Sequence, residues 1–173
     1  FHQYPELSNR EFNTAKTIAD ELKRLGLEVK TGVAHTGVTG FLRGSKPGPT
    51  VALRADMDAL PVLEASGLPF ASTATATFRG KKTGVMHACG HDTHMAILLG
   101  VAKSLTQIKG ELTGNVLFIF QPAEEGAPGD EEGGAELMLK EGLFDTYKPD
   151  VAFGLHSWSS LNAGKVGYRS GPA

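Results

Sequence analysis

The sequence predicts an α/β fold in which a mixed, mostly parallel sheet carries helices on both faces. Three observations support this fold class. Short apolar strands alternate along the chain with amphipathic helical patterns. At 173 residues and 40% hydrophobic content, the chain is long enough to bury a sizeable core. The 22 glycines are scattered, and neither an internal repeat nor a linker divides the chain, so we expect one domain.

The first half of the chain predicts one helix followed by three strands. Ser8 and Glu11 form a candidate capping box before a helix over about residues 10–25, which Gly26 would end. Residues 64–84 are rich in Gly, Ser, Thr and Ala, and we expect a loop with little regular structure there. The strands are expected near 27–31, 39–43 and 51–55.

The second half predicts two helices and three strands. Met95, Leu98, Leu99, Ala102 and Leu105 recur at helical spacing, which indicates that they face the core. The strand patterns are short and apolar, as in strands buried on both faces. In chain order the expected elements are a helix at 92–107, a strand at 115–120, a helix at 134–141, a strand at 151–156 and a strand at 165–169.

The run from Met86 to His94 concentrates one thiol, three imidazoles and a carboxylate. Cys89 is the only cysteine of the chain, so no internal disulfide explains it. Gly90 lets the backbone bend so that Cys89 and His91 can converge, and a thiolate with an imidazole suits a borderline-soft divalent metal. Taken alone, a buried free cysteine beside surface histidines is at least as good an interpretation.

A second cluster, with the adjacent carboxylates Glu124 and Glu125, follows the apolar strand 115–120. Ligands bind at the carboxyl ends of the strands in open α/β sheets, and buried carboxylates there need a cation or a proton. One glutamate can bind a metal while its neighbour handles the proton of a bound water. The alternative is a solvated acidic loop, which is the interpretation that we adopt for residues 130–132.

Two further strands end in polar residues. Asp56 and Asp58 leave the strand near 51–55 at a spacing that puts both carboxylates on one side. Such an aspartate often orients a metal-bound histidine, although a salt bridge with Arg54 is the simpler structural role. The strand over 151–156 ends in His156, which alone would be an ordinary hydrogen-bonded histidine. Four polar groups at the ends of apolar elements together favour a metal site.

Four segments of the chain resemble motifs of a known family: RADMDALP, MHACGHDTH, QPAEEG and GLH, in that order. They are similar to motifs of the dinuclear metal-dependent amidohydrolases related to aminoacylase. That family includes hippurate hydrolase, plant hydrolases of indole-acetyl amino acids, and bacterial N-acyl amino acid amidohydrolases and carboxypeptidases. The opening HQYPELS is similar to the family's HxxPEL segment. The resemblance covers essentially the whole chain.

The resemblance implies a fold, a cofactor and a set of ligands. The fold would be a three-layer sandwich of the zinc-exopeptidase kind. Two divalent ions would be bound, either zinc, manganese, cobalt or nickel. Cys89, His91, Glu125 and His156 would be metal ligands, with the thiolate of Cys89 shared between the two ions.

The resemblance also implies roles around these ligands. Glu124 would be the general base that takes a proton from the attacking water and passes it to the leaving amine. Asp58 would be the second catalytic residue, orienting the site, with Asp56 beside it. Asp92 and His94 belong to the motif and would have supporting or packing roles.

Family members are about twice as long as this chain. We therefore expect residues 1–173 to be the N-terminal portion of a metallopeptidase-type catalytic domain, without the lid or dimerisation domain and without the final histidine ligand. The full-length parent is expected to form homo-oligomers, and the fragment alone to be weakly active or inactive.

The expected activity of the parent is metal-dependent hydrolysis of the amide bond of N-acyl amino acids or short peptides. A cysteine-nucleophile hydrolase using Cys89 and a non-catalytic metal-binding module or inactive fragment are the alternatives. A net charge of −2 without a basic stripe argues against nucleic-acid binding, and no apolar run is long enough for a transmembrane helix. We expect a cytoplasmic protein, although a chain that starts at Phe1 leaves a secretion signal open.

Overall fold

A computed structural model describes residues 1–168 and 170 of the chain. Its main sheet has five strands in the spatial order β1-β2-β6-β3-β7, and a separate sheet has two strands. The main strands are β1 (Glu28–Val33), β2 (Gly37–Arg43), β3 (Lys46–Asp56), β6 (Thr113–Gln121) and β7 (Val151–Gly154).

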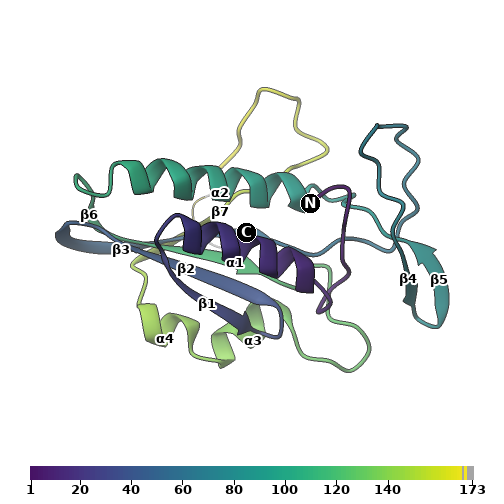
Figure 1. Ribbon diagram of the computed structural model, residues 1–173, viewed down its shortest axis with the longest axis horizontal. Coiled ribbons are helices and arrows are strands. Elements are labelled where there is room, and N and C mark those ends of the chain that lie inside the picture. The colour runs from purple at the N-terminus through teal and green to yellow at the C-terminus, as the bar shows by residue number, and fades with distance from the viewer. Residues whose placement is uncertain (169, 171–173) are drawn as a thin grey trace.

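Helices cover both faces of this sheet. Figure 1 shows α1 and α2 on one face and α3 and α4 on the other. The three-layer α/β architecture expected from the sequence is therefore confirmed. The helices are α1 (Phe12–Arg24), α2 (His91–Gln107), α3 (Gly134–Lys140) and α4 (Leu143–Tyr147).

Each face of the sheet has its own apolar core, because successive side chains of a strand point to opposite faces. On β6, Phe118 and Phe120 pack with α1 and α2, whereas Leu117 and Ile119 pack against Met138 of α3 and its neighbours. All four of these β6 residues are buried. A central strand that is apolar on both faces is what a sheet between two helical layers requires.

The sheet is mixed, with its parallel part at the β7 side. Strand β3 pairs in parallel with both β6 and β7, whereas β2 pairs antiparallel with β1 and β6. In the parallel part, Asp56 lies opposite Gln121 and Arg54 lies opposite Gly154. The segments that follow β3, β6 and β7 therefore leave the sheet at the same edge.

The expected loop over residues 64–84 is only partly observed. It contains a hairpin of β4 (Thr75–Phe78) and β5 (Lys81–Gly84), which projects from the main sheet (Figure 1). Arg79 and Gly80 both have positive φ, at 50° and 75°, as in a two-residue type I′ turn. The prediction of little regular structure is wrong for these residues, because a hairpin that is mostly exposed needs no apolar pattern.

The predicted capping box at the start of α1 is also wrong. Glu11 is completely buried and accepts hydrogen bonds from the Thr36 hydroxyl at 2.5 Å and the Ala123 amide at 2.9 Å. Ser8 donates its hydroxyl hydrogen bond to Asp58 instead. The first amides of the helix are satisfied by Glu6, which accepts from the backbone N–H of Thr14 at 2.8 Å.

The C-terminal region departs from expectation in two places. The short helix α4 was not anticipated. The strand expected at 165–169 does not form over residues 165–168, where Val166 and Tyr168 are 87% and 97% exposed, and Arg169 lies outside the described residues. Across residues 1–168 and 170, we find no helix with the length and apolarity needed to cross a lipid bilayer.

Candidate metal centre

Four segments that are distant in sequence meet at the edge where the parallel strands end. Cys89, His91 and Glu125 each offer a donor atom, and these atoms lie within 4.8 Å of one another. Asp56, His91, His94 and His156 form a second, overlapping group with the same spacing. The convergence of Cys89, His91, Glu125 and His156 that the sequence predicted is thus observed.

Gly90 determines how Cys89 and His91 enter the site. Its φ of +86° lies in the left-handed region, and a Cβ there would lie 2.6 Å from the Ser157 Oγ. That hydroxyl donates to the Cys89 carbonyl at 2.9 Å, so the segment after β7 packs directly on the turn before α2. Glycine is required here by both the backbone angle and the close approach.

One ring nitrogen of His91 is hydrogen-bonded, and the other has no hydrogen-bond partner among the described residues. Its Nδ1 donates to the backbone carbonyl of Asp58 at 2.8 Å, which makes the neutral Nε2 an acceptor. This Nε2 is buried and has no hydrogen-bond partner among the described residues. It lies 3.5 Å from Glu124 Oε2 and 3.8 Å from Glu125 Oε1. This nitrogen is buried, has no hydrogen-bond partner among the described residues and lies among atoms that can bind a metal. A metal-binding histidine needs such a nitrogen.

Asp58 lies beneath the site and holds the glutamate loop. Its carboxylate accepts hydrogen bonds from the backbone amides of Glu124 and Glu125, each at 3.0 Å, and from the Ser8 hydroxyl at 2.7 Å. Burial alone would raise the pKa of Asp58, but the hydrogen bonds from His91, from the two amides and from Ser8 lower it below its ordinary value. Asp58 is therefore an ionised anchor for the adjacent glutamates.

Asp56 faces the donors themselves. Arg54 donates to its Oδ2 at 2.8 Å, so the salt bridge considered from the sequence is present. The same oxygen lies 3.7 Å from His91 Nε2 and 3.9 Å from His156 Nε2. The sequence analysis placed Asp56 beside Asp58 and considered both as residues that could orient a metal-bound histidine, without assigning Asp56 as a metal ligand.

Both ring nitrogens of His94 are already used. Its Nδ1 donates to Asp56 at 2.7 Å, and its Nε2 accepts the backbone N–H of Ser157 at 2.9 Å. His94 thus lacks a free lone pair for a metal, despite its proximity to the other donors. It links Asp56 to the segment that carries His156, in keeping with the supporting role expected from the sequence.

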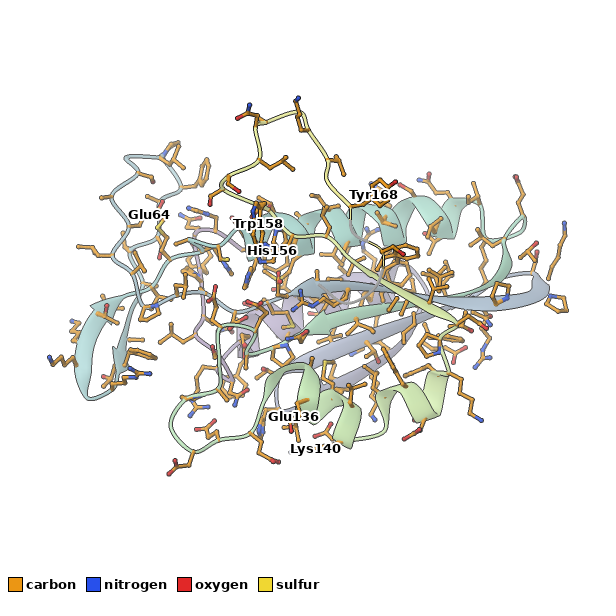
Figure 2. All side chains as sticks on the ribbon, turned by 180° about the vertical axis from the view of Figure 1, so that it is seen from behind. Glu64, Glu136, Lys140, His156, Trp158 and Tyr168 are labelled. Carbon is orange, nitrogen blue, oxygen red and sulfur yellow. The ribbon has the colours of Figure 1, made fainter. Side chains whose placement is uncertain are left out.

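His156 completes the cluster from the C-terminal segment. Its Nδ1 donates to the Ser157 carbonyl at 2.6 Å, and its Nε2 lies 3.7 Å from the Cys89 sulfur. Figure 2 shows His156 where the chain leaves the sheet for its last long loop, with Trp158 beside it. The sequence placed His156 at the end of a strand, whereas β7 ends at Gly154, two residues earlier.

The chemistry of the donors fits a divalent cation. Burial, a hydrogen bond with Glu125 and the charge of nearby carboxylates raise the pKa of the Cys89 thiol to about 11. A nucleophilic cysteine needs the opposite shift, so this environment argues against the cysteine-hydrolase alternative. A bound cation would deprotonate the thiol and neutralise the same carboxylates. Thiolate, imidazole and carboxylate together suit zinc and related first-row ions.

One buried histidine next to the site was not singled out from the sequence. His87 is 4% exposed, and neither of its ring nitrogens has a hydrogen-bond partner within the described part of the chain. Burial lowers the pKa of His87 to about 4, so the ring is neutral at physiological pH. The only sequence signal was its place within the histidine-rich run.

The fold and the site define a class: a three-layer α/β protein with a candidate divalent-metal centre where its parallel strands end. A family model agrees with this class. The model described as "Peptidase family M20/M25/M40" matches residues 52–171, and the chain belongs to this family. The resemblance inferred from the four sequence motifs is thereby confirmed.

Relatives of known name support the same assignment. "Thermostable carboxypeptidase 1" of Saccharolobus solfataricus is 50% identical over 172 residues, covering 99% of this chain and 40% of the relative. The "N-acyl-L-amino acid amidohydrolase" of Geobacillus stearothermophilus is 44% identical, covering 99% of this chain and 42% of the relative. The chain therefore spans about two fifths of the length of these proteins.

A solved structure matches the fold. A Bacillus subtilis protein described as a dinuclear metal binding peptidase from the M20 family superposes with a TM-score of 0.84 at 41% identity. The match covers 99% of this chain and 44% of that protein.

Proposed function

We propose that the chain is the N-terminal portion of the catalytic domain of a metal-dependent amidohydrolase. The parent protein would hydrolyse the amide bond of N-acyl amino acids or short peptides. The observation that carries this proposal is the convergence of thiol, imidazole and carboxylate donors around the unpartnered His91 Nε2, with Glu124 beside it. The relatives named as a carboxypeptidase and an N-acyl amino acid amidohydrolase support the same reaction type.

The cofactor in this proposal is a pair of divalent ions. The donors for them would be Cys89, His91, Glu125 and His156, and further ligands would come from the rest of the parent chain. The similar Bacillus protein described as dinuclear supports two ions. Thiolate and imidazole favour Zn²⁺, Co²⁺ or Ni²⁺, whereas the carboxylates also accept Mn²⁺. Such ions would polarise the amide carbonyl and acidify water.

The side chains of this chain supply the proton transfers. Glu124 would accept a proton from the water whose oxygen attacks the carbonyl carbon. As the carbon–nitrogen bond breaks, the protonated Glu124 would donate that proton to the leaving amine. The position of Glu124 is fixed by Asp58, whose carboxylate accepts hydrogen bonds from the backbone amides of Glu124 and Glu125. Since Asp58 acts through that loop, its role is positioning.

The test is Glu124→Gln in the full-length parent. Glutamine keeps the size and hydrogen-bonding shape of the side chain but cannot take up the proton. We expect kcat for an N-acyl amino acid to fall by about 10²–10⁴-fold, while metal content by elemental analysis stays at the wild-type level. Asp130→Asn, an exposed substitution in the same loop, is the matched control and should leave both quantities unchanged.

Two results would count against the proposal. Turnover retained by Glu124→Gln with metal bound would reject the assignment of the base. A wild-type parent that holds metal but hydrolyses no substrate in a panel of N-acyl amino acids would favour a non-catalytic metal-binding module. Cytoplasmic location, homo-oligomerisation and the lack of nucleic-acid or membrane partners stay predictions from the sequence.

A further inference from the structure

Two cavities border the donor cluster, which consists of Cys89, His91, Glu125 and His156, and different residues line them. One, of about 470 Å³, borders Glu125 and is lined by Arg10 and Arg79 among other residues. The other, of about 760 Å³, borders Cys89 and His156. Among the described residues, neither lysine nor arginine lines this second cavity. A reacting amide at these residues therefore has, on one side, a cavity with two arginines, of which Arg10 is paired with Glu131. On the other side it has a cavity whose titratable residues besides Cys89 are histidines and Asp92.

The second cavity has an apolar wall of three large side chains. Leu68, Phe70 and Trp158 line it and are 44%, 48% and 69% exposed. Figure 2 shows Trp158 near His156, at the base of the C-terminal loop. Large aromatic side chains left in water around a cavity typically mark a binding surface for an apolar group.

The loop that carries Leu68 and Phe70 is held in place by a buried carboxylate. The side chain of Glu64 is fully buried and accepts hydrogen bonds from the Ser72 amide, from the Ser66 hydroxyl and from His2 Nε2 at 3.0 Å. The Ser66 and His2 contacts lower the pKa of Glu64 to about 2, so the anchor is ionised.

His2 connects this loop to the metal-centre segment. Its Nδ1 lies 2.8 Å from Asp92 at the start of α2, and its ring meets the ring of Phe70 edge-on at 5.6 Å between centroids. The 2.8 Å contact pairs the carboxylate of Asp92, the acidic residue that lines the cavity, with the imidazole of His2. The loop that carries part of the apolar wall is thus held in place, and the charge of Asp92 is compensated by His2.

We propose that this second cavity is the acyl-group pocket and that Phe70 and Trp158 select aromatic or other large apolar acyl groups over acetyl. This inference rests on the proposed function. The acyl group of an N-acyl amino acid carries no charge, which fits a cavity whose wall is apolar and whose acidic residue, Asp92, is already paired with His2. Stacking against flat aromatic side chains suits an aroyl group in particular.

The test compares two substrates in the metal-loaded full-length parent. For Phe70→Ala and for Trp158→Ala, we expect kcat/KM for N-benzoyl-L-alanine to fall by about tenfold, because each loses one aromatic contact. For N-acetyl-L-alanine the change should stay within about twofold, since acetyl is too small to fill the wall. Phe12→Ala, which removes an aromatic side chain that is 62% exposed and outside the cavity, should change neither value.

Equal losses for both substrates would overturn the proposal, because they would indicate a general structural role or a wall covered by the remainder of the parent chain. Unchanged kcat/KM for both substrates in Phe70→Ala and Trp158→Ala would overturn it as well. A conservative Trp158→Phe should restore most of the preference for benzoyl.

A binding measurement separates this inference from the proposed hydrolysis. Trp158 is the only tryptophan of the 173 residues, so titration with benzoate should change a fluorescence component that Trp158→Phe lacks. Acetate is the matched probe and should have no effect. If the wild-type parent hydrolyses neither substrate, the proposed function fails, yet saturable benzoate binding that Phe70→Ala weakens would still support the pocket. No benzoate binding up to about 10 mM would overturn it.

Discussion

Two neighbouring groups of polar side chains contrast in how their hydrogen bonds are satisfied. The anchoring network consists of Ser8, Glu11, Thr36 and Asp58, and each of its carboxylate oxygens accepts a hydrogen bond. The donor cluster consists of Cys89, His91, Glu125 and His156. In it, the Cys89 sulfur lies 3.7 Å from His156 Nε2, and His91 Nε2 lies 3.8 Å from Glu125 Oε1. The carboxylates of the network have all their oxygens hydrogen-bonded within the chain, whereas the atoms of the cluster need a cation between them.

The difference indicates which residues serve the fold and which serve the chemistry. A buried carboxylate with donors on both oxygens stabilises the loops that it joins. In the cluster, burial, a hydrogen bond with Glu125 and the charges of nearby carboxylates raise the pKa of the Cys89 thiol. Substitutions in the network should therefore destabilise the metal-free protein, and substitutions in the cluster should act only through the metal.

The largest effect is expected for the donor cluster. In the full-length parent, Cys89→Ala and Glu125→Gln should lower metal affinity by at least about 100-fold, because loss of an orienting partner alone costs 10–100-fold. The rise in Tm on adding metal, which follows from binding to the folded state, should shrink or vanish. In chelator, Glu125→Gln should keep the wild-type Tm within about 2 °C, because the side chain is partly exposed and glutamine can still accept a hydrogen bond from the Cys89 thiol.

The matched control for these variants is Glu136→Gln, which removes a carboxylate that is exposed on α3. It should leave both metal affinity and Tm unchanged. A Cys89→Ala variant that binds metal as tightly as wild type would remove Cys89 from the cluster.

An intermediate effect is expected at Asp58, which belongs to the network but adjoins the cluster. Asparagine has one acceptor oxygen and cannot accept from the amides of both Glu124 and Glu125. Asp58→Asn should therefore lower the free energy of unfolding in chelator by about 1–3 kcal/mol, as measured by urea denaturation. Asp20→Asn, on the exposed face of α1, is the control and should change stability by less than about 0.5 kcal/mol.

This measurement also tests the division between the two groups. If Asp58→Asn is as stable as wild type in chelator and loses stability only with metal, Asp58 belongs functionally to the donor cluster.

The sequence predicted elements whose stability depends on a repeating apolar pattern. Helices α1 and α2 and strands β3 and β6 bury such patterns, and their observed bounds differ from the expected ones by a few residues. The β4–β5 hairpin lacks this pattern because both its faces are largely exposed. Its turn, Arg79-Gly80, was the remaining signal. The strand expected at 165–169 has an apolar residue, Val166, but among the described residues no strand lies beside it.

The sequence predicted which residues form the site, because they belong to recognisable motifs. It did not predict their hydrogen-bond partners, because these depend on how the folded chain packs. The approach of Cys89, Glu125 and His156 followed from polar residues at the ends of apolar strands. The partner of Ser8 did not, because a hydroxyl can cap a helix or bind a distant carboxylate with equal ease, and only the folded chain brings Asp58 within reach. Likewise, the hydrogen bonds that occupy both nitrogens of His94 depend on Asp56 and on Ser157, 63 residues away.

The smallest effect is expected from Glu11, and it concerns pH. Burial raises the pKa of Glu11 above its ordinary value of 4.5, although hydrogen bonds from Thr36 and Ala123 oppose the shift. The folded state then holds the proton more tightly than the unfolded chain. Its contribution to the free energy of unfolding is accordingly greatest below pH 4.5 and declines as pH rises through the folded pKa.

Glu11→Gln should remove this decline, because glutamine resembles the protonated acid at every pH. The stability difference between wild type and variant, measured by urea denaturation in chelator from pH 4 to 8, should change in favour of the variant as pH rises. Glu21→Gln, on the exposed surface of α1, provides the comparison and should not show this sign. A wild-type protein that instead gains stability over the variant with rising pH would mean that the hydrogen bonds from Thr36 and Ala123 outweigh burial at Glu11, so the network would favour the carboxylate at this position as well.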